Sequence, residues 1–212
     1  MNLNKEFFFP TITYFADLED AAALNQYLKT RIYAWRDLDQ DGITRSNTKR
    51  AGAWHSHTTM NVLPEYKLFV DQVNAVMAKV FEDQLYSDQY FASCHNMWAN
   101  VSPKGGYNRS HVHPGSLWSG VYYVQTPEHS GRIIFQDPRP QVSMVSAVYQ
   151  DKTKAGPQQW QEINYEPIAG RMILFPSWLR HEVESNLNEL GGDDADRISI
   201  SFNYGQAPIQ KA

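Results

Sequence analysis

The pattern of hydrophobic and polar positions divides the chain into a helical first third and a strand-rich remainder. Apolar residues recur at roughly helical spacing over residues 17–34, where Asp17 is expected as the N-cap. The same spacing recurs over residues 64–85, where Pro64 suits the first turn. Between these two predicted helices, residues 37–59 are rich in Asp, Gly, Ser, Asn and Thr, which predicts a long loop.

Beyond residue 90 the chain changes to short runs of Val, Ile, Tyr, Phe and Trp separated by Gly, Pro and Asn, a pattern typical of strands. Several short strands at this spacing predict a sandwich, barrel or jelly roll, with the two helices on one outer face. We interpret 1–212 as a single domain, mainly helical over 1–90 and with a β core over 91–205. The predicted strands are 91–101, 110–113, 117–125, 131–136, 141–149, 159–164, 171–176, 180–185 and 196–204.

Composition narrows the class of protein. The chain has 212 residues, 42% of them hydrophobic, which is enough for a packed core. A net charge of -4 argues against binding to nucleic acid. No apolar run approaches the roughly 20 residues that a membrane span needs, and Met1–Glu6 has no signal-peptide pattern. We therefore expect a cytoplasmic protein that binds neither nucleic acid nor membrane.

Two further composition features bear on disulfides and assembly. The single cysteine, Cys94, excludes an intrachain disulfide and a multi-cysteine metal site. The apolar run Phe7-Phe8-Phe9-Pro10 suits a dimer contact or packing on the sheet. The sequence therefore leaves a monomer and a homodimer both open.

Histidines are the first candidates for chemistry. The chain has seven histidines, and four of them form two pairs with His-x-His spacing, His55 with His57 and His111 with His113. In a strand such a pair points to one face and can chelate a metal ion. The first pair falls in the polar loop, whereas the second falls at the head of a predicted strand. His181 follows the buried run 171–176 and is a third candidate ligand, although structural or surface histidines are the ordinary alternative.

A candidate anion site lies in the predicted final strand. Arg197 and Ser199 share one face of that strand, where they can hold a carboxylate through a charge-assisted fork and a hydroxyl. The alternative for Arg197 is a surface salt bridge with Asp193, Asp194 or Asp196.

The order of these parts resembles the iron(II)- and 2-oxoglutarate-dependent oxygenases: a His-x-ligand motif, a strand-rich insert, a distal histidine, and Arg-x-Ser. Residues 119–125, Ser-Gly-Val-Tyr-Tyr-Val-Gln, are similar to a strand of the prolyl-hydroxylase-like members. More closely, His111-Val112-His113-Pro114-Gly115-Ser116 and Phe135–Arg139 resemble an uncharacterised group of bacterial and phage sequences in that family. The Ser46-Asn47 and Trp54–Ser56 stretches resemble the same group.

This resemblance implies a double-stranded β-helix, that is, a jelly-roll core with helices against one sheet. It also implies Fe(II), 2-oxoglutarate and O2 as reactants, and a dioxygenase that hydroxylates an unidentified small-molecule or peptidyl substrate. His111, His113 and His181 would bind the metal. Arg197, Ser199 and Tyr123 would hold the far carboxylate of 2-oxoglutarate, with Ser119 as a further candidate.

One departure from the family pattern concerns His113, which stands where the facial triad has its carboxylate. We favour a three-histidine site, because positions i and i+2 place His113 where that carboxylate would reach. The second interpretation is a site of His111 and His181 completed by water, halide, Asp137 or Glu182. The third is a degraded site in a binding module.

The remaining candidates concern the substrate. Trp54 and His55 lie on the long loop that could cover the site, Asn100 could lie near the metal, and Arg139 could meet an anionic substrate at the mouth. Two other functions stay open: a three-histidine cupin-like dioxygenase that uses no 2-oxoglutarate, and a non-catalytic jelly-roll binding protein.

Overall fold

The computed structural model describes residues 2–145 and 147–209 and has two β layers. Its α-helices are α1 (Ala21–Leu38), α2 (Gly42–Arg45) and α3 (Lys67–Asp83). Its strands are β1 (Tyr14–Asp17), β2 (Trp54–His55), β3 (Tyr90–Ser102), β4 (Asn108–His111), β5 (Trp118–Gln125), β6 (Ile133–Gln136), β7 (Glu162–Tyr165), β8 (Arg171–Pro176), β9 (His181–Val183) and β10 (Arg197–Pro208).

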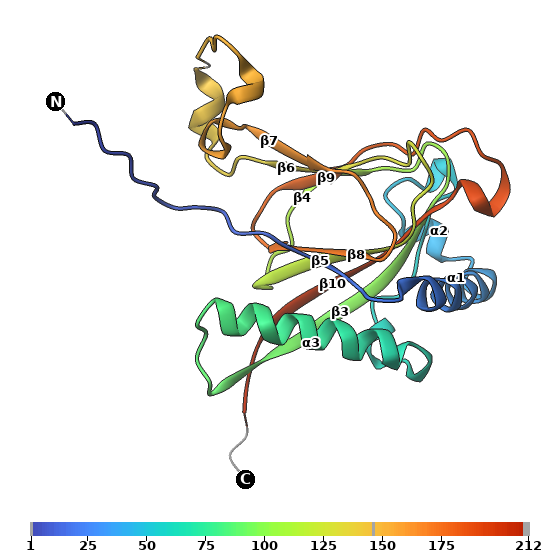
Figure 1. Cartoon of the computed structure of the whole chain (residues 1–212). Helices are drawn as coiled ribbons and strands as arrows, with labels where there is room; N and C mark the ends of the chain where they lie inside the picture. Colours follow the sequence, from blue (N-terminus) through green and yellow to red (C-terminus); the bar gives the residue numbers. More distant parts are fainter. Residues whose placement is uncertain (1, 146, 210–212) are drawn as a thin grey trace.

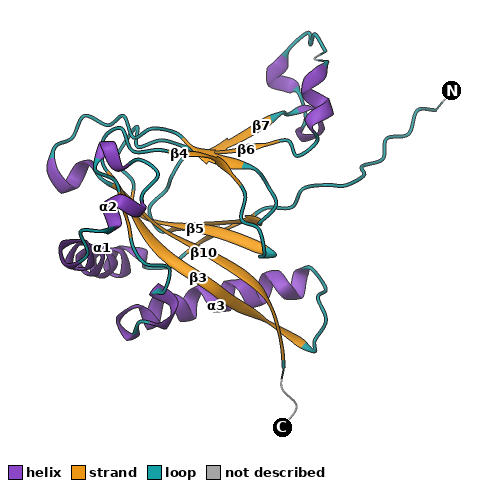
Figure 2. Ribbon diagram, turned by 180° about the vertical axis from the view of Figure 1, so that it is seen from behind, coloured by secondary structure: helices purple, strands orange, loops and turns teal. Residues whose placement is uncertain are grey.

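The strands form two antiparallel sheets that face each other (Figure 1). The six-stranded sheet has the order β1-β8-β5-β10-β3-β2, and the four-stranded sheet has the order β4-β9-β6-β7. Figure 2 shows α1 and α3 together on the outer face of the six-stranded sheet. The predicted arrangement, a mainly β fold with two helices on one outer face, is confirmed.

Strand periodicity assigns the two faces of the six-stranded sheet. Along β10, Ile198, Ile200 and Phe202 point outward and pack with Phe69 and Met77 of α3 in the larger core cluster. The intervening side chains point into the space between the sheets. A smaller apolar cluster fills part of that interior and consists of Val121, Tyr123, Ile133, Phe135, Ile173, Phe175 and Leu179.

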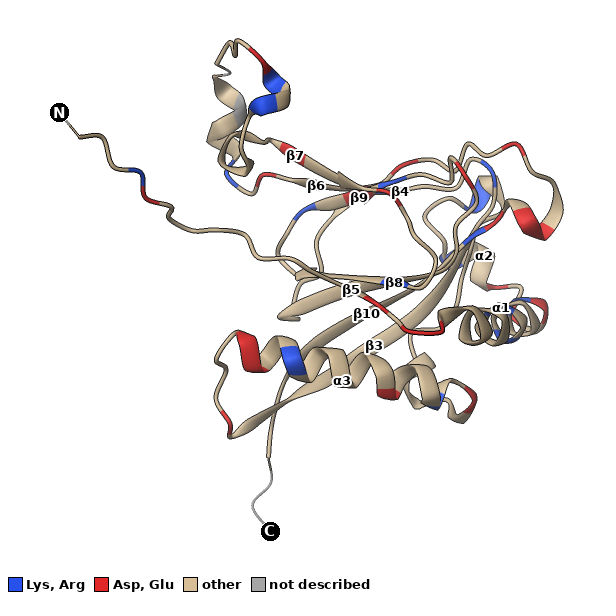
Figure 3. Ribbon diagram, viewed as in Figure 1, with Lys and Arg blue, Asp and Glu red and all other residues tan. Residues whose placement is uncertain are grey.

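Charged residues lie mostly outside these layers. Figure 3 shows acidic and basic residues interspersed over the helices and loops, while β3 and β5 carry none. No helix within the described residues is long and apolar enough to cross a membrane.

The predicted first helix starts too early. Helix α1 begins at Ala21, because Asp17 belongs to β1 and binds the Arg171 guanidinium through both carboxylate oxygens, at 2.6 and 2.7 Å. The predicted second helix is confirmed, with a 3-10 turn over Pro64–Tyr66 leading into α3.

One predicted strand is wrong, while the other eight each overlap an observed strand. Over 141–149 the structure has a 3-10 helix at Pro140–Met144 and no strand among the described residues that follow. The apolar side chains that suggested a strand are exposed, with Val145 at 85% and Val148 at 99%, since no neighbouring strand covers them. The predicted loop over 37–59 also contains α2 and the short strand β2.

Gly120 should prove necessary for packing between β5 and β10. A Cβ at this position would overlap the Phe202 ring and lie 2.8 Å from Leu174 Cδ2. We expect Gly120→Ala to lower the free energy of unfolding by about 1–3 kcal/mol, as overpacking does. Urea unfolding measures this, with Gly191→Ala as control because nothing lies within 4 Å of that position. Equal midpoints for both variants would contradict the packing argument.

Candidate active site

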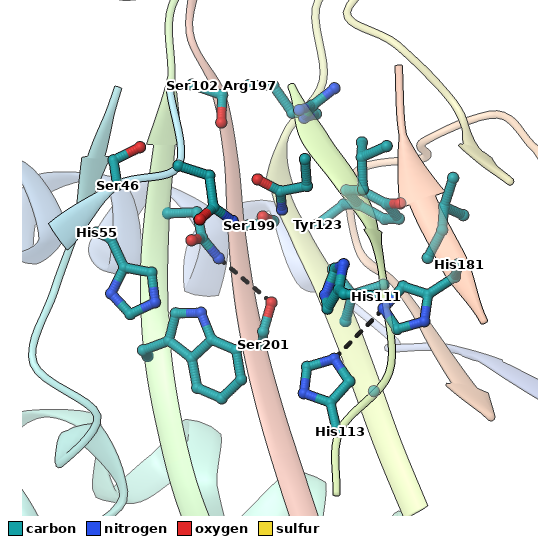
Figure 4. A pocket seen from close by; sticks show the side chains of 18 of the residues that line it. Ser46, His55, Ser102, His111, His113, Tyr123, His181, Arg197, Ser199 and Ser201 are labelled. Carbon is teal, nitrogen blue, oxygen red and sulfur yellow. Dashed lines mark hydrogen bonds between the residues drawn. The ribbon is translucent and has the colours of Figure 1, made fainter. Parts of the chain in front are cut away.

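Three histidines meet between the sheets. His111 ends β4 and His181 begins β9, and the two are opposite each other in the antiparallel pair. His113 follows in the loop after β4, where its backbone N–H donates to the Ser177 carbonyl at 2.9 Å. One ligand nitrogen from each ring lies within 4.8 Å of the others, and the Nε2 atoms of His113 and His181 are 3.3 Å apart (Figure 4). This cluster has the spacing of a metal site.

Backbone carbonyls fix the tautomers of two of these rings. His111 Nδ1 lies 2.6 Å from the Arg109 oxygen, and His181 Nδ1 lies 2.9 Å from the Leu179 oxygen. A carbonyl only accepts, so each Nδ1 carries the proton and each Nε2 keeps its lone pair. Such hydrogen bonds orient metal-binding imidazoles.

His113 and His181 are also neutral. Burial lowers the pKa of His113 to about 4 and that of His181 to about 3. Neutral imidazole is the form that binds a metal ion.

A cavity of about 230 Å³ extends from the histidines to Arg197. The Arg197 side chain is 3% exposed, and its Nη1 donates to three backbone carbonyls, those of Ser130, Gly131 (3.3 Å) and Glu184 (3.2 Å). Among the described residues, no carboxylate lies within ion-pair distance of this guanidinium.

The predicted alternative for Arg197, a surface salt bridge, is wrong. The acidic residues of the preceding loop bind elsewhere: Asp194 pairs with Lys29, and Asp193 and Asp196 pair with Arg36. A buried cation without an acidic partner is costly. The end of the cavity at Arg197 is therefore suited to an anion.

Tyr123 and Ser199 line the cavity beside Arg197. They are opposite each other in the β5–β10 pair, so the sheet register brings them together. Burial raises the pKa of Tyr123 to about 12, which keeps its hydroxyl protonated as a donor. No hydrogen bond from that hydroxyl to another described residue is present, so it is free to meet a ligand.

Asn100 and His55 line the cavity as well. Asn100 Nδ2 donates to Ser201 Oγ at 3.2 Å. His55 is opposite Asn100 in the β2–β3 pair and stacks on Trp98, with ring centroids 5.6 Å apart. Figure 4 shows His55 across the cavity from His111 and His181, and the strand register places Asn100 beside it on the same wall.

The structure does not bring Trp54 or Ser119 to the cavity. Trp54 neighbours His55 on β2 and so points to the opposite face, where it is 1% exposed, contacts Trp35 and donates from Nε1 to the Asp39 carbonyl at 2.8 Å. Ser119 shares a face with Tyr123 but lies four residues, roughly 13 Å, along the strand. Its hydroxyl contacts the side chains of Ser177 and Asn203, each at 2.7 Å. Contrary to expectation, Trp54 therefore does not cover the site, and Ser119 does not reach the end of the cavity at Arg197.

Arg139 is also outside this cavity. It binds Asp137 through Nε (3.0 Å) and Nη2 (2.8 Å) and lines a separate surface cavity. These hydrogen bonds hold the pKa of Asp137 below its usual value. Glu182 neighbours His181 on β9 and points to the opposite face. Asp137 and Glu182 both lie outside the histidine cavity. Neither of them can therefore complete a metal site together with His111 and His181.

Several residues that line the cavity were not predicted from the sequence. Residues two positions apart on a strand share a face, which is the rule that selected Arg197 and Ser199. The same rule would have added Ser201 on β10, and it would have added Trp98 as the residue that shares a face with Asn100 on β3. Asn108 had no such signal, because it reaches the cavity through the irregular register between β4 and β9. The lining residues outside the candidate set are Ser46, Asn47, Trp98, Ser102, Asn108, Gly120, Val121, Ile133, Phe175, Val183 and Ser201.

Comparison with known families identifies the chain. The sequence profile of a family described as 2OG-Fe(II) oxygenase matches residues 96–203, which include every histidine of the cluster and Arg197. The chain belongs to this 2OG-Fe(II) oxygenase family. No curated protein sequence matches the chain significantly.

Solved structures show the same fold at low sequence identity. A Pseudomonas putida prolyl-4-hydroxylase has a TM-score of 0.60 at 14% identity, over 91% of this chain and 92% of that one. HygX from Streptomyces hygroscopicus with iron bound has a TM-score of 0.58 at 12% identity, over 92% and 82%. HygX with nickel, 2-oxoglutarate and hygromycin B has a TM-score of 0.55 at 10% identity, over 92% and 83%.

These findings settle fold and reaction class. The fold is the double-stranded β-helix predicted from the sequence. This oxygenase is an oxidoreductase that uses Fe(II), 2-oxoglutarate and O2, as expected. The two other functions, a dioxygenase without 2-oxoglutarate and a binding protein, are disfavoured accordingly.

Removing His113 tests the metal cluster directly. We expect His113→Ala to weaken Co(II) or Zn(II) binding by about a hundredfold or more, since even losing a residue that only supports a ligand costs 10–100-fold. Calorimetric titration measures this. His57→Ala is the matched control, because His57 belongs to the other His-x-His pair and is exposed. Equal affinities for the two variants would exclude His113 as a ligand.

Proposed function

We propose that His111, His113 and His181 hold Fe(II) in a three-histidine site. Support comes from the lone pairs on Nε2 of His111 and His181, since Nδ1 carries the proton in both rings, and from the spacing of the cluster. A facial triad ordinarily has two histidines and one carboxylate. No Asp or Glu among the described residues lines this cavity, so His113 is the available third ligand.

We further propose that Arg197, Tyr123 and Ser199 hold the far carboxylate of 2-oxoglutarate. The observation that carries this proposal is the buried Arg197, which lacks an acidic partner among the described residues and lies in one cavity with the three histidines. A dicarboxylate that spans this cavity can place one end at the metal and pair the other with the guanidinium.

The loops around Arg197 fix its direction. Arg132 binds both carboxylate oxygens of Glu184, at 2.8 and 2.7 Å, and the Glu184 backbone N–H donates to the Arg132 carbonyl. This connection presents the Glu184 carbonyl to Arg197 Nη1. Gly131 completes the enclosure with a φ of +94°, and a Cβ there would lie 2.7 Å from Nη1. We infer that Gly131, Arg132 and Glu184 act as positioning residues.

When bound, iron with 2-oxoglutarate and O2 supplies the oxidation of an unactivated C–H bond, and hydroxylation is the proposed outcome. The chain contributes orientation through Arg197, Tyr123 and Ser199. It excludes water through the apolar interior around Phe135 and Phe175.

The substrate is proposed only as a small molecule or a peptidyl side chain. One similar structure is a prolyl-4-hydroxylase and another is HygX with hygromycin B bound, and the identity of both to this chain is low. The cytoplasmic location stays a prediction, as do the absence of nucleic-acid and membrane binding and the choice between monomer and homodimer. Phe7, Phe8 and Phe9 are 66%, 70% and 93% exposed on the segment before β1.

Anaerobic addition of Fe(II) and then 2-oxoglutarate tests the proposed function by visible absorption. We expect a metal-to-ligand band in the wild type. Arg197→Leu should bind Fe(II) normally and require at least tenfold more 2-oxoglutarate for the same band, because the guanidinium that pairs with the carboxylate is gone. Arg139→Leu is the control and should match the wild type. A band that forms equally well in Arg197→Leu would overturn the assigned role of Arg197.

Gly131→Ala tests the positioning residues. The added methyl group displaces the guanidinium, so the Kd for 2-oxoglutarate should rise about tenfold while Fe(II) affinity is unchanged. Gly192→Ala is a matched control, because Gly192 also has a positive φ, +64°, but nothing within 4 Å of its Cβ position. The same band titration gives both constants. Identical values for the two variants would mean that only backbone strain matters.

A further inference from the structure

The cavity wall opposite the three histidines is polar but uncharged. It consists of Ser46, Asn47, Asn100 and Ser201, together with the stacked rings of Trp98 and His55. Figure 4 shows Ser46, His55 and Ser201 across the cavity from His111 and His181. The far end of the cavity is assigned to 2-oxoglutarate, so this wall is the part available to the substrate.

Charge counting shows what the wall must accommodate. Fe(II) contributes two positive charges and Arg197 one, while 2-oxoglutarate brings two negative charges. Three neutral imidazoles add nothing, whereas a carboxylate ligand would have cancelled the remaining positive charge. The loaded site therefore carries one uncompensated positive charge inside a largely buried cavity, which is unfavourable without a counter-anion.

Nearby acids do not supply that anion inside the cavity, because no Asp or Glu among the described residues lines it. Asp39 binds Arg45, Asp137 binds Arg139, and Glu184 and Glu166 share Arg132. Arg109, an exposed residue two positions before His111 on β4, has no acidic partner among the described residues and adds a further positive charge.

The wall has hydrogen-bond donors that are available to a ligand. Ser201 Oγ accepts from Asn100 Nδ2, so its own O–H is free to donate, and Asn100 keeps its second N–H. Ser46 Oγ accepts from the Thr48 backbone N–H at 3.2 Å, which likewise leaves its O–H free. A carboxylate is acceptor-only and matches such a set of donors.

We propose that this wall binds a carboxylate of the substrate, so that the enzyme oxidises a small molecule carrying one carboxylate near the reacting carbon. This inference rests on the proposed function, because the charge count requires three histidine ligands and bound 2-oxoglutarate. The cavity volume of about 230 Å³ is below the usual 300–1,000 Å³ of ligand pockets, which favours a small reacting group.

Acetate and acetamide are matched probes, equal in shape and different in charge. We expect the anaerobic Fe(II)–2-oxoglutarate protein to bind acetate at least tenfold more tightly than acetamide, measured by calorimetry and by a shift of the visible band. Asn100→Ala should weaken acetate binding about tenfold and leave the band itself intact. Equal affinity for the two probes would overturn the inference.

His113→Asp returns the missing negative charge and should abolish the preference for acetate while keeping the band. If acetate is still preferred in this variant, the charge argument is wrong. Chloride tests the other source of a counter-anion: if it competes with acetate at equal affinity in both the wild type and Asn100→Ala, the anion lies on the metal and not on the wall. Absence of the band in the wild type would instead overturn the proposed function.

Discussion

The structure of the site depends on burying one guanidinium. Arg197 enters the space between the sheets, and the two loops that precede β6 and follow β9 must close so that their carbonyls bind its Nη1. Burying this charge without such acceptors would be costly. The loops are joined by the Arg132–Glu184 pair, and Gly131 is the residue type that fits between them. The cavity therefore has one fixed, charged end.

Sheet register places the rest of the site relative to that end. The β5–β10 pair puts Tyr123 opposite Ser199, and the β4–β9 pair puts His111 opposite His181. Each of these strand pairs lies in a sheet that has a packed face. A shift by one residue would turn the buried side chains to the other face, so the register is fixed. The distance between the metal end and the anion end is thus set by strands, and only His113 depends on a loop. Rigid elements hold functional groups more accurately than loops do.

Period two explains which residues could be predicted. Tyr123 was expected in the cavity from the family resemblance of residues 119–125. Period two itself correctly placed Arg197 and Ser199 there, because alternation along a strand depends only on local geometry. It could not say how far along the face the cavity extends, which is why Ser119 was misplaced. Trp54 was misplaced because the strand β2 was not predicted inside the polar loop. The wrong strand over 141–149 had the right composition, but pairing depends on a partner strand that sequence pattern does not supply.

The histidine at position 113 changes the electrostatics of the site more than its geometry. An imidazole and a carboxylate can both reach a metal from this position, but they differ by one unit of charge. In water such a difference is screened, whereas between two packed sheets it persists. No acid among the described residues lines the cavity, so none lies beside the cluster to balance the charge. In the proposed three-histidine site, compensation would come from a bound molecule, and the ligand set at the metal would then help to determine the charge that the enzyme selects in its substrate.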